Sequence, residues 1–343
     1  MQVVVVLVLS IIGSVWGTNY PDFSWDTLPL FQHNGNSSGP YSPSVISYLA
    51  KFPLLTVEKM ACMQCEPANH KQEDKILAAL KSVKAVNPRQ KSLAYLNTIL
   101  NFPQYDLYDQ VMADPSLLLH NSSGQIAELN IRGSTWTVFD HSNPKMRALW
   151  LNTSNYFLSH GADGIFADRG RSSAEVDLAK ISLSPEKRKA WDEGHLLVML
   201  ELQEQITNKT GEFAILNGRD EPGVLGRMFE DFSVNDVHAV PPGDDLPVLM
   251  NETSNGPRVA EVHADKCPSG PSLLFNTTIT SFLIGAGEYS YYGCTEGWRT
   301  DAGWLEVRPE YLERLGAPTS HATGNVKDGV HYWSRSFASG TTV

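Results

Sequence analysis

The chain has 343 residues, enough for one large domain with a sizeable core, and it contains no evident repeat or long low-complexity tract. Its formal net charge of −11 argues against nucleic acid or an anionic membrane surface as a partner. We therefore expect a single globular domain that binds neither of them.

The chain begins with an apolar segment that is typical of a secretory signal peptide. Residues 3–12 are predominantly apolar, and Val15-Trp16-Gly17 forms a suitable cleavage site before Thr18. The segment is too short to cross a bilayer, and no later segment reaches the roughly 20 apolar residues that a membrane helix needs. We expect residues 1–17 to be removed, which leaves residues 18–343 as a secreted, extracellular protein.

Six N-x-Ser/Thr sequons agree with export. One sequon arises easily by chance, but six in one exported chain favour a glycoprotein, even if some of them stay unused. The acceptor residues are Asn36, Asn121, Asn152, Asn208, Asn251 and Asn276.

Short apolar runs alternate with helical patterns along the chain. Strands are predicted at Leu28–His33, Leu54–Glu58, Ser92–Asn97, Gly164–Asp168, Phe213–Asn217, Gly226–Asp231, Arg258–His263 and Tyr289–Tyr292. Helices are predicted at Gln72–Val86, Pro144–Leu158, Glu186–Asn208 and Ser272–Ile284. This alternation predicts an α/β fold, a (β/α)8 TIM barrel. The alternative is a doubly wound open sheet, which is disfavoured because no Gly-rich phosphate loop follows the first strand.

Three further segments read differently from the barrel units. The long interval between the third and fourth strands contains Tyr105–Ile131, which we interpret as an active-site loop over the barrel mouth. Val237–Pro247 is rich in Pro, Gly and Asp and also reads as a loop. The tail, His331–Val343, predicts one strand or half a hairpin, and therefore a short C-terminal β extension of the barrel.

Four cysteines allow three pairings, and disulfides are the expected state outside the cell. A redox role for Cys62-Met-Gln-Cys65 would need a thioredoxin-like context that the sequence lacks, and no histidine lies nearby at metal-ligand spacing. Cys267 and Cys294 follow the seventh and eighth strands, so they lie on neighbouring loops of a barrel. We predict the disulfides Cys62–Cys65 and Cys267–Cys294.

Four segments resemble the poorly characterised glycoside-hydrolase-like barrel proteins, the hypothetical glycosyl hydrolases. They are Ser92-Leu-Ala-Tyr-Leu-Asn97, Val138-Phe-Asp-His-Ser-Asn-Pro144, Asp163-Gly-Ile-Phe-Ala-Asp-Arg169 and Tyr332-Trp-Ser-Arg-Ser-Phe-Ala-Ser-Gly340. The second and third together are fairly specific, and the likeness runs from about residue 25 to the end of the chain. The resemblance implies a glycosidase-type barrel, but a fold does not determine a function, so the site is argued from its residues.

Hydrolysis of a glycosidic bond usually needs two carboxyl groups, one on either side of the bond. The apolar run Gly164–Asp168 ends at an acid, at the end of a barrel strand where catalytic groups gather. Asp168 on the fourth strand and Glu230 on the sixth can face each other across the barrel mouth. Alpha-galactosidase-like barrels, which this arrangement resembles, place their nucleophile and acid on the same two strands. We predict Asp168 as nucleophile or electrostatic stabiliser and Glu230 as general acid/base.

Two alternatives stay open for this pair. Asp168 could instead cap the helix that follows it, which is a common role for aspartate. Asp231 could replace Glu230, because a slip of one residue exchanges the side chains that point inward and outward.

Sugars are held by hydrogen-bonding side chains and by flat aromatic faces. Arg169 is expected to pair with a carboxylate, and Trp298 either stacks on a sugar ring or packs its loop against the barrel. Other candidates for substrate binding lie near predicted strand ends: His33, Glu58, Lys59, Tyr95, Asn97, Asn217, Arg219, Asp231, His263 and Tyr291.

The sequence therefore predicts a secreted glycoside hydrolase-like enzyme that binds a carbohydrate and needs no cofactor or metal. One alternative is a carbohydrate-binding protein without hydrolytic activity, in which the carboxyl groups lie too far apart. The other is a barrel recruited for a different reaction on a small molecule, which a closed, apolar, aromatic-lined cavity would favour.

Overall fold

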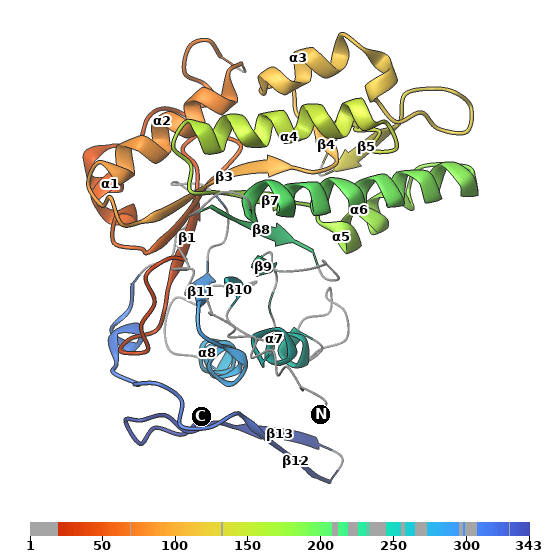
Figure 1. Ribbon diagram of the computed structural model, residues 1–343. Helices are drawn as coiled ribbons and strands as arrows, with labels where there is room; N and C mark the ends of the chain where they lie inside the picture. The colour runs from red at the N-terminus through yellow and green to blue at the C-terminus, as the bar shows by residue number, and fades with distance from the viewer. Residues whose placement is uncertain are drawn as a thin grey trace, which may run out of the picture.

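The structure is a computed structural model. It describes residues 20–68, 70–131, 133–207, 212–218, 226–230, 232, 245–254, 258–264, 273–294, 298, 307–328 and 330–343. Eight parallel strands form one sheet in the order β1-β2-β3-β7-β8-β9-β10-β11. A bridge between Leu30 and Tyr292 brings the last strand back to the first, so the sheet forms a nearly closed barrel. Helices surround it (Figure 1), and the predicted (β/α)8 fold is confirmed.

The barrel strands agree closely with the predicted ones. They are β1 (Phe31–Asn34), β2 (Leu54–Val57), β3 (Lys91–Asn97), β7 (Gly164–Asp168), β8 (Phe213–Asn217), β9 (Gly226–Phe229), β10 (Ala260–Ala264) and β11 (Ser290–Cys294). The largest difference concerns β1, which begins three residues later than predicted. Tyr289 has a φ of 66°, a left-handed conformation that strands do not use, so β11 begins one residue later than predicted and continues to Cys294. Of the predicted sixth strand, Asp231 lies outside the described residues.

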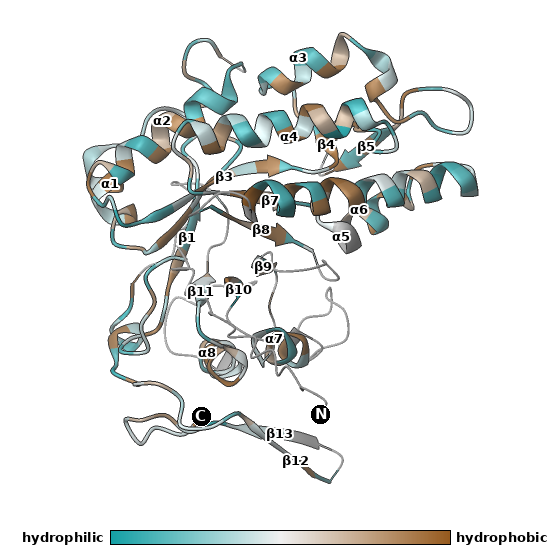
Figure 2. Ribbon diagram, viewed as in Figure 1, coloured by the Kyte–Doolittle hydropathy of each residue, from teal (hydrophilic) through white to brown (hydrophobic). Residues whose placement is uncertain are grey.

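The helices around the barrel carry both hydrophobic and hydrophilic residues (Figure 2). They are α1 (Pro43–Leu49), α2 (Gln72–Lys84), α4 (Pro144–Ser159), α5 (Arg171–Leu178), α6 (Pro185–Thr207), α7 (Asp245–Ser254) and α8 (Leu273–Gly285). All four predicted helices are present within two residues of their expected bounds. α4 begins where the sequence indicates, because the Asn143 side chain accepts a hydrogen bond from the Lys145 amide and Pro144 occupies the first turn. The predicted loop Val237–Pro247 lies mostly outside the described residues, and α7 occupies its end.

Strand registers place equivalent residues at the same level of the barrel interior. His33, Thr56, Leu93 and Gly164 lie side by side at one such level. Gly164 is required there, because an added Cβ would collide with the Phe213 carbonyl group of the next strand. Two residues further along β3 and β7, Tyr95 pairs with Phe166, and beyond them Asn97 pairs with Asp168 at the carboxyl end.

The segment between β3 and α4 is folded, which corrects the prediction of a loop over residues 105–131. It contains β4 (Leu100–Asn101), α3 (Asp106–Met112), a 3-10 turn (Pro115–Leu117), β5 (Glu128–Ile131) and β6 (Ser134–Val138). The three strands form a separate antiparallel sheet in the order β4-β6-β5. Apolar and polar residues alternate along β5 and β6, which is the pattern of a sheet with one buried face. We call residues 98–143 the insertion.

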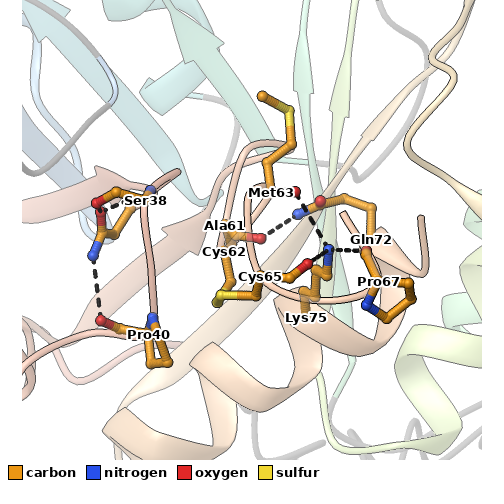
Figure 3. Close-up of a disulfide and its surroundings, with 10 residues drawn as sticks. Ser38, Pro40, Ala61, Cys62, Met63, Cys65, Pro67, Gln72 and Lys75 are labelled. Atoms are coloured by element: carbon orange, nitrogen blue, oxygen red, sulfur yellow. Dashed lines mark hydrogen bonds between the residues drawn. A yellow bond between two sulfur atoms is a disulfide. The ribbon is translucent and has the colours of Figure 1, made fainter. Parts of the chain in front are cut away.

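The predicted disulfide Cys62–Cys65 is present in the loop after β2 (Figure 3). Lys75 of α2 holds this loop, since its Nζ donates hydrogen bonds to the carbonyl oxygens of Cys65 at 2.8 Å and Pro67 at 2.7 Å. Cys294 is also disulfide-bonded, whereas its predicted partner Cys267 lies outside the described residues.

The predicted C-terminal β extension is an antiparallel hairpin of β12 (Thr323–Lys327) and β13 (Val330–Ser334), and it lies beyond α7 and α8 in Figure 1. β12 precedes the segment in which the tail strand was expected. The Arg335 guanidinium fastens the tail to the end of α8 by donating to the Leu283 carbonyl at 3.0 Å and the Ile284 carbonyl at 3.3 Å. In the described part of the chain, no helix is long and apolar enough to cross a membrane.

Candidate active site

A cavity of about 360 Å³ lies at the carboxyl ends of the barrel strands, where (β/α)8 enzymes place their catalytic groups. Polar side chains from the barrel line one part of it and apolar side chains from the insertion line the other. The lining residues are His33, Glu58, Lys59, Tyr95, Asn97, Leu100, Phe102, Ile131, Trp136, Asp168, Arg169, Asn217, Glu230 and Trp298.

Asp168 is held at the end of β7 by hydrogen-bond donors from β3 and β8. Its Oδ2 accepts from the Tyr95 hydroxyl and from Asn97 Nδ2 at 2.9 Å. Its Oδ1 accepts from Asn217 Nδ2 at 3.0 Å and from the Arg169 amide at 2.9 Å. Burial and the nearby Asp168 carboxylate raise the pKa of Tyr95 well above its usual range, so that hydroxyl stays protonated and able to donate. The orientation of the Asp168 carboxylate is therefore fixed.

Asn217 joins the two predicted carboxylates. Its Nδ2 donates to Asp168 Oδ1 at 3.0 Å and to Glu230 Oε2 at 2.6 Å. Because both oxygen atoms contact one nitrogen atom, they lie within about 6 Å of each other. This upper limit lies below the roughly 6.5–9.5 Å between the carboxyl groups of inverting glycosidases and is compatible with the roughly 5–5.5 Å of retaining ones.

A third carboxylate, Glu58, directly follows β2 and belongs to a charged cluster that also lines the cavity. Its Oε2 contacts Lys59 Nζ at 2.9 Å, and its Oε1 lies 3.1 Å from His33 Nε2. Burial alone would raise the pKa of Glu58, but Lys59 and His33 outweigh it and lower that pKa to about 2. Glu58 is thus ionised and already paired, which makes it unsuited to proton transfer. The Lys59 ammonium also lies over the Tyr95 ring, 4.2 Å from its centroid.

Trp298 forms one wall of the cavity. Its ring centroid lies 4.5 Å from that of His33 and 4.3 Å from that of His263, and its carbonyl accepts a hydrogen bond from the Gly35 amide. His263 does not line the cavity itself but supports Trp298 there. Trp298 therefore packs against the barrel, as one of its two predicted roles requires, and it also lines the cavity.

One of the other predicted site residues differs from expectation. Tyr291 is not brought to the cavity, because it is the second residue of β11 and its hydroxyl donates to the Pro21 carbonyl at 2.9 Å. Arg169 lines the cavity and pairs with a carboxylate as expected, and its partner is Asp177 of α5. Arg219 lies outside the described residues, as does Asp231, the alternative to Glu230.

Four lining residues had not been predicted: Leu100, Phe102, Ile131 and Trp136. All belong to the insertion, and Ile131 lies in the segment that was interpreted as a loop. The alternation in Glu128–Ile131 and Ser134–Val138 was the signal that could have revealed Ile131 and Trp136. Within the described ranges, no group of three or more His, Cys, Asp or Glu side chains could hold a metal ion.

Comparisons with known proteins identify the family of the chain. The model of hypothetical glycosyl hydrolase family 15 matches residues 84–341, as the sequence resemblance predicted. No curated protein matches the chain. The family match supports a glycosidase-like function.

The similar solved structures include a GH31 family sulfoquinovosidase from E. rectale in complex with an aza-sugar inhibitor, with a TM-score of 0.55 and 15% identity. The alignment covers 83% of this chain and 45% of that one, so the chain spans less than half of the length of that protein. The glycoside hydrolase domain of PelA from Pseudomonas aeruginosa has a TM-score of 0.47 and 15% identity over 80% of this chain and 94% of that one. At 15% identity, the likeness to the sulfoquinovosidase shows a shared fold alone.

Proposed function

Since the chain belongs to hypothetical glycosyl hydrolase family 15, we propose that its barrel cavity hydrolyses glycosidic bonds with Asp168 and Glu230 as the carboxylate pair. The observation that carries the proposal is the Asn217 amide, which contacts both carboxylates and limits their separation. The carbohydrate bound there would lie across the carboxyl ends of β7, β8 and β9.

The short separation favours a retaining mechanism. Asp168 attacks the anomeric carbon while Glu230 protonates the glycosidic oxygen, so the bond breaks, the alcohol leaves and a glycosyl ester forms on Asp168. A water molecule then attacks the same carbon as Glu230 takes its proton. The ester bond breaks, Asp168 is released as a carboxylate, and the sugar keeps its anomeric configuration.

The assignment of the two roles follows from the hydrogen bonds. Asp168 accepts hydrogen bonds from Tyr95, Asn97 and Asn217, which aim a carboxylate in one direction, as a nucleophile requires. A helix-capping role for Asp168 is not supported, because Gly170 is the N-cap of α5 and no side chain caps that helix.

The alternative functions fit the cavity less well. A binding protein without hydrolytic activity has no need for two carboxylates joined by one amide. A barrel recruited for chemistry on an apolar small molecule would favour an apolar cavity, whereas Glu58, Asp168 and Glu230 all line this one.

The proposal is tested by screening the purified protein against 4-nitrophenyl glycosides and oligosaccharides, with the first-formed anomer identified by NMR. Asp168→Asn should abolish turnover, because the amide cannot form the glycosyl ester. Glu230→Gln should lower kcat by about 10²–10⁴-fold for alkyl glycosides, and less for 4-nitrophenyl glycosides, whose leaving group needs little protonation. Glu128→Gln, an exposed position on β5, is the matched control and should keep full activity.

Turnover that survives Asp168→Asn would leave a glycosidase but discard this catalytic pair. Inversion of the anomeric configuration would keep the two residues and discard the retaining mechanism. A folded protein without turnover on any substrate would refute the proposed function.

A further inference from the structure

The insertion sheet separates its side chains by polarity. Strand registers place Leu129 opposite Trp136 and Leu100 opposite Val138, so these four apolar side chains share one face. Glu128, Asn130 and Thr135 alternate with them and are exposed on the other face. The sheet therefore presents an apolar surface to the barrel and a polar surface to solvent.

Part of this apolar surface reaches the cavity. Leu100, Phe102, Ile131 and Trp136 line it, and we call these four residues the apolar wall. The rings of Phe102 and Trp136 pack edge to face, with centroids 5.0 Å apart and an interplanar angle of 84°, which fixes the orientation of the indole. Leu129 and Val138 are fully buried, whereas Ile131 and Trp136 stay partly exposed. Hydrophobic surface left uncovered inside a cavity indicates a ligand that covers it.

The cavity thus has two chemically different parts. The carboxylates and amides belong to the ends of the barrel strands, and they suit the hydroxyl groups and the anomeric centre of a sugar. Apart from the indole N–H of Trp136, the apolar wall offers no hydrogen-bonding side chain, and it suits a ring or chain with an apolar face. At about 360 Å³ the cavity is near the lower end of the roughly 300–1,000 Å³ of small-molecule sites, which favours a short glycoside over a polymer.

We propose that the apolar wall is a leaving-group subsite that selects glycosides with an aromatic or otherwise apolar aglycone. This inference rests on the proposed function, because it places the sugar at Asp168 and Glu230 and the aglycone at Trp136. The aglycone stacks on the exposed face of the indole and contacts Ile131, while the glycosidic oxygen lies toward the carboxylate pair.

The test measures binding rather than turnover, so that it stands apart from the question of hydrolysis. Phenyl and methyl 1-thioglycosides of the common hexoses resist hydrolysis and differ only in the aglycone. By titration calorimetry, the wild-type protein should bind the phenyl member of the best pair about tenfold more tightly than the methyl member. Trp136→Ala should remove this preference by weakening the binding of the phenyl member, while Trp136→Phe should retain most of it.

Trp333→Ala is the matched control, because Trp333 belongs to the C-terminal hairpin and packs on Gly324 of the adjacent strand. Near-UV circular dichroism establishes whether each variant is folded. If Trp136→Ala does not fold, Ile131→Thr provides the same comparison at the edge of the wall, with a smaller expected loss.

Equal affinity of the wild-type protein for phenyl and methyl thioglycosides, or no binding of either, would overturn the subsite. So would a phenyl preference that survives both Trp136→Ala and Ile131→Thr. The proposed function would fail by a different result. A folded protein that binds a phenyl thioglycoside at Trp136 but hydrolyses no glycoside would refute hydrolysis and leave the subsite standing.

Discussion

Glu58 shows how its neighbours can keep a fully buried carboxylate ionised in the core. Burial opposes its charge, but the Lys59 ammonium and His33 lower its pKa from an ordinary value of 4.5 to about 2. A carboxyl group whose pKa is lower in the folded state stabilises the fold above its unfolded pKa, and this contribution disappears as the pH falls through the folded value. The charges of Glu58, Lys59 and His33 should therefore stabilise the fold at neutral pH, and this stabilisation should be lost in acid.

Glu58→Gln should reduce the free energy of unfolding by about 3 kcal/mol at pH 7, because the variant lacks the carboxylate whose pKa the fold lowers from 4.5 to about 2. The difference from wild type should shrink as the pH falls from about 4.5 towards 2. Urea unfolding at several pH values measures it, with Glu128→Gln as a surface control. A difference that stays constant from pH 6 to pH 3 would contradict the assigned charge.

Glu261 of β10 behaves in the opposite way. Burial raises its pKa to about 8, against a lowering effect of the Thr56 hydroxyl. Between about pH 4.5 and pH 8, Glu261 is therefore protonated in the folded protein and ionised in the unfolded chain. The free energy of unfolding falls as the pH rises through this range.

Glu261→Gln keeps the shape of the protonated acid and should remove this pH dependence. Relative to wild type, the variant should gain up to about 1.4 kcal/mol in unfolding free energy for each pH unit between 5 and 8. The same urea experiment detects this gain. As the pH rises, the stability of Glu261→Gln relative to wild type should increase, whereas that of Glu58→Gln should decrease. A variant with the same pH slope as wild type would show that Glu261 is ionised in the fold.

At the residue scale, the sequence predicted the position of a side chain best where that residue ends a predicted strand. Asp168, Asn97 and Asn217 end strands with predicted carboxyl ends, so their meeting at the cavity could be expected. Tyr291 could not be placed in this way, because the left-handed Tyr289 shifts β11 toward its carboxyl end. The sequence also could not predict that Asn217 donates hydrogen bonds to both Asp168 and Glu230, because this depends on side-chain distances between neighbouring strands.

At the scale of elements, β7 and β8 were predicted to the residue. Both are short apolar runs bounded by polar residues, and in a parallel sheet covered on both faces such runs leave little choice of boundary. The insertion was misread for the opposite reason. Its strands are two to five residues long and alternate in polarity, and the Asp, Asn, Ser and Gly around them are also typical of loops.

The loop after β2 offers a prediction at this scale. The Cys62–Cys65 bond closes a loop of four residues, and chain-entropy arguments assign about 2 kcal/mol to a loop of that length. Cys62→Ser combined with Cys65→Ser should therefore lower the unfolding free energy by about 2 kcal/mol. Urea unfolding measures this, and an unchanged midpoint and slope would show that Lys75 and Gln72 hold the loop without the disulfide.

At the scale of the whole molecule, the barrel followed from the alternation of strands and helices, and its near closure is confirmed. We propose that the protein is exported and glycosylated, in line with its sequons and the Cys62–Cys65 disulfide. Asn152, Asn251 and Asn276 are exposed, and Asn36 and Asn121 are half-buried. Asn208 and the predicted signal peptide lie outside the described residues.

Expression in secreting eukaryotic cells should therefore place the protein in the medium, with glycans at Asn152, Asn251 and Asn276. Mass spectrometry before and after treatment with peptide N-glycosidase measures occupancy at each site. Asn152→Gln, Asn251→Gln and Asn276→Gln should each remove one glycan. Retention inside the cell, or a mass unaffected by the glycosidase, would refute the proposal.

The junction between β11 and β1 has a consequence for how the barrel opens. Every other neighbouring pair of strands is joined by three to five registered residue pairs, whereas the described residues of this junction share one bridge and the hydrogen bond from the Tyr292 amide to the Pro29 carbonyl. Local fluctuations should therefore part the barrel here first. Asp168, Asn217 and Glu230 belong to the carboxyl ends of β7–β9, away from this junction. Transient opening of the junction beside Trp298 can therefore admit and release ligands, while the hydrogen bonds around the carboxylate pair keep it aligned.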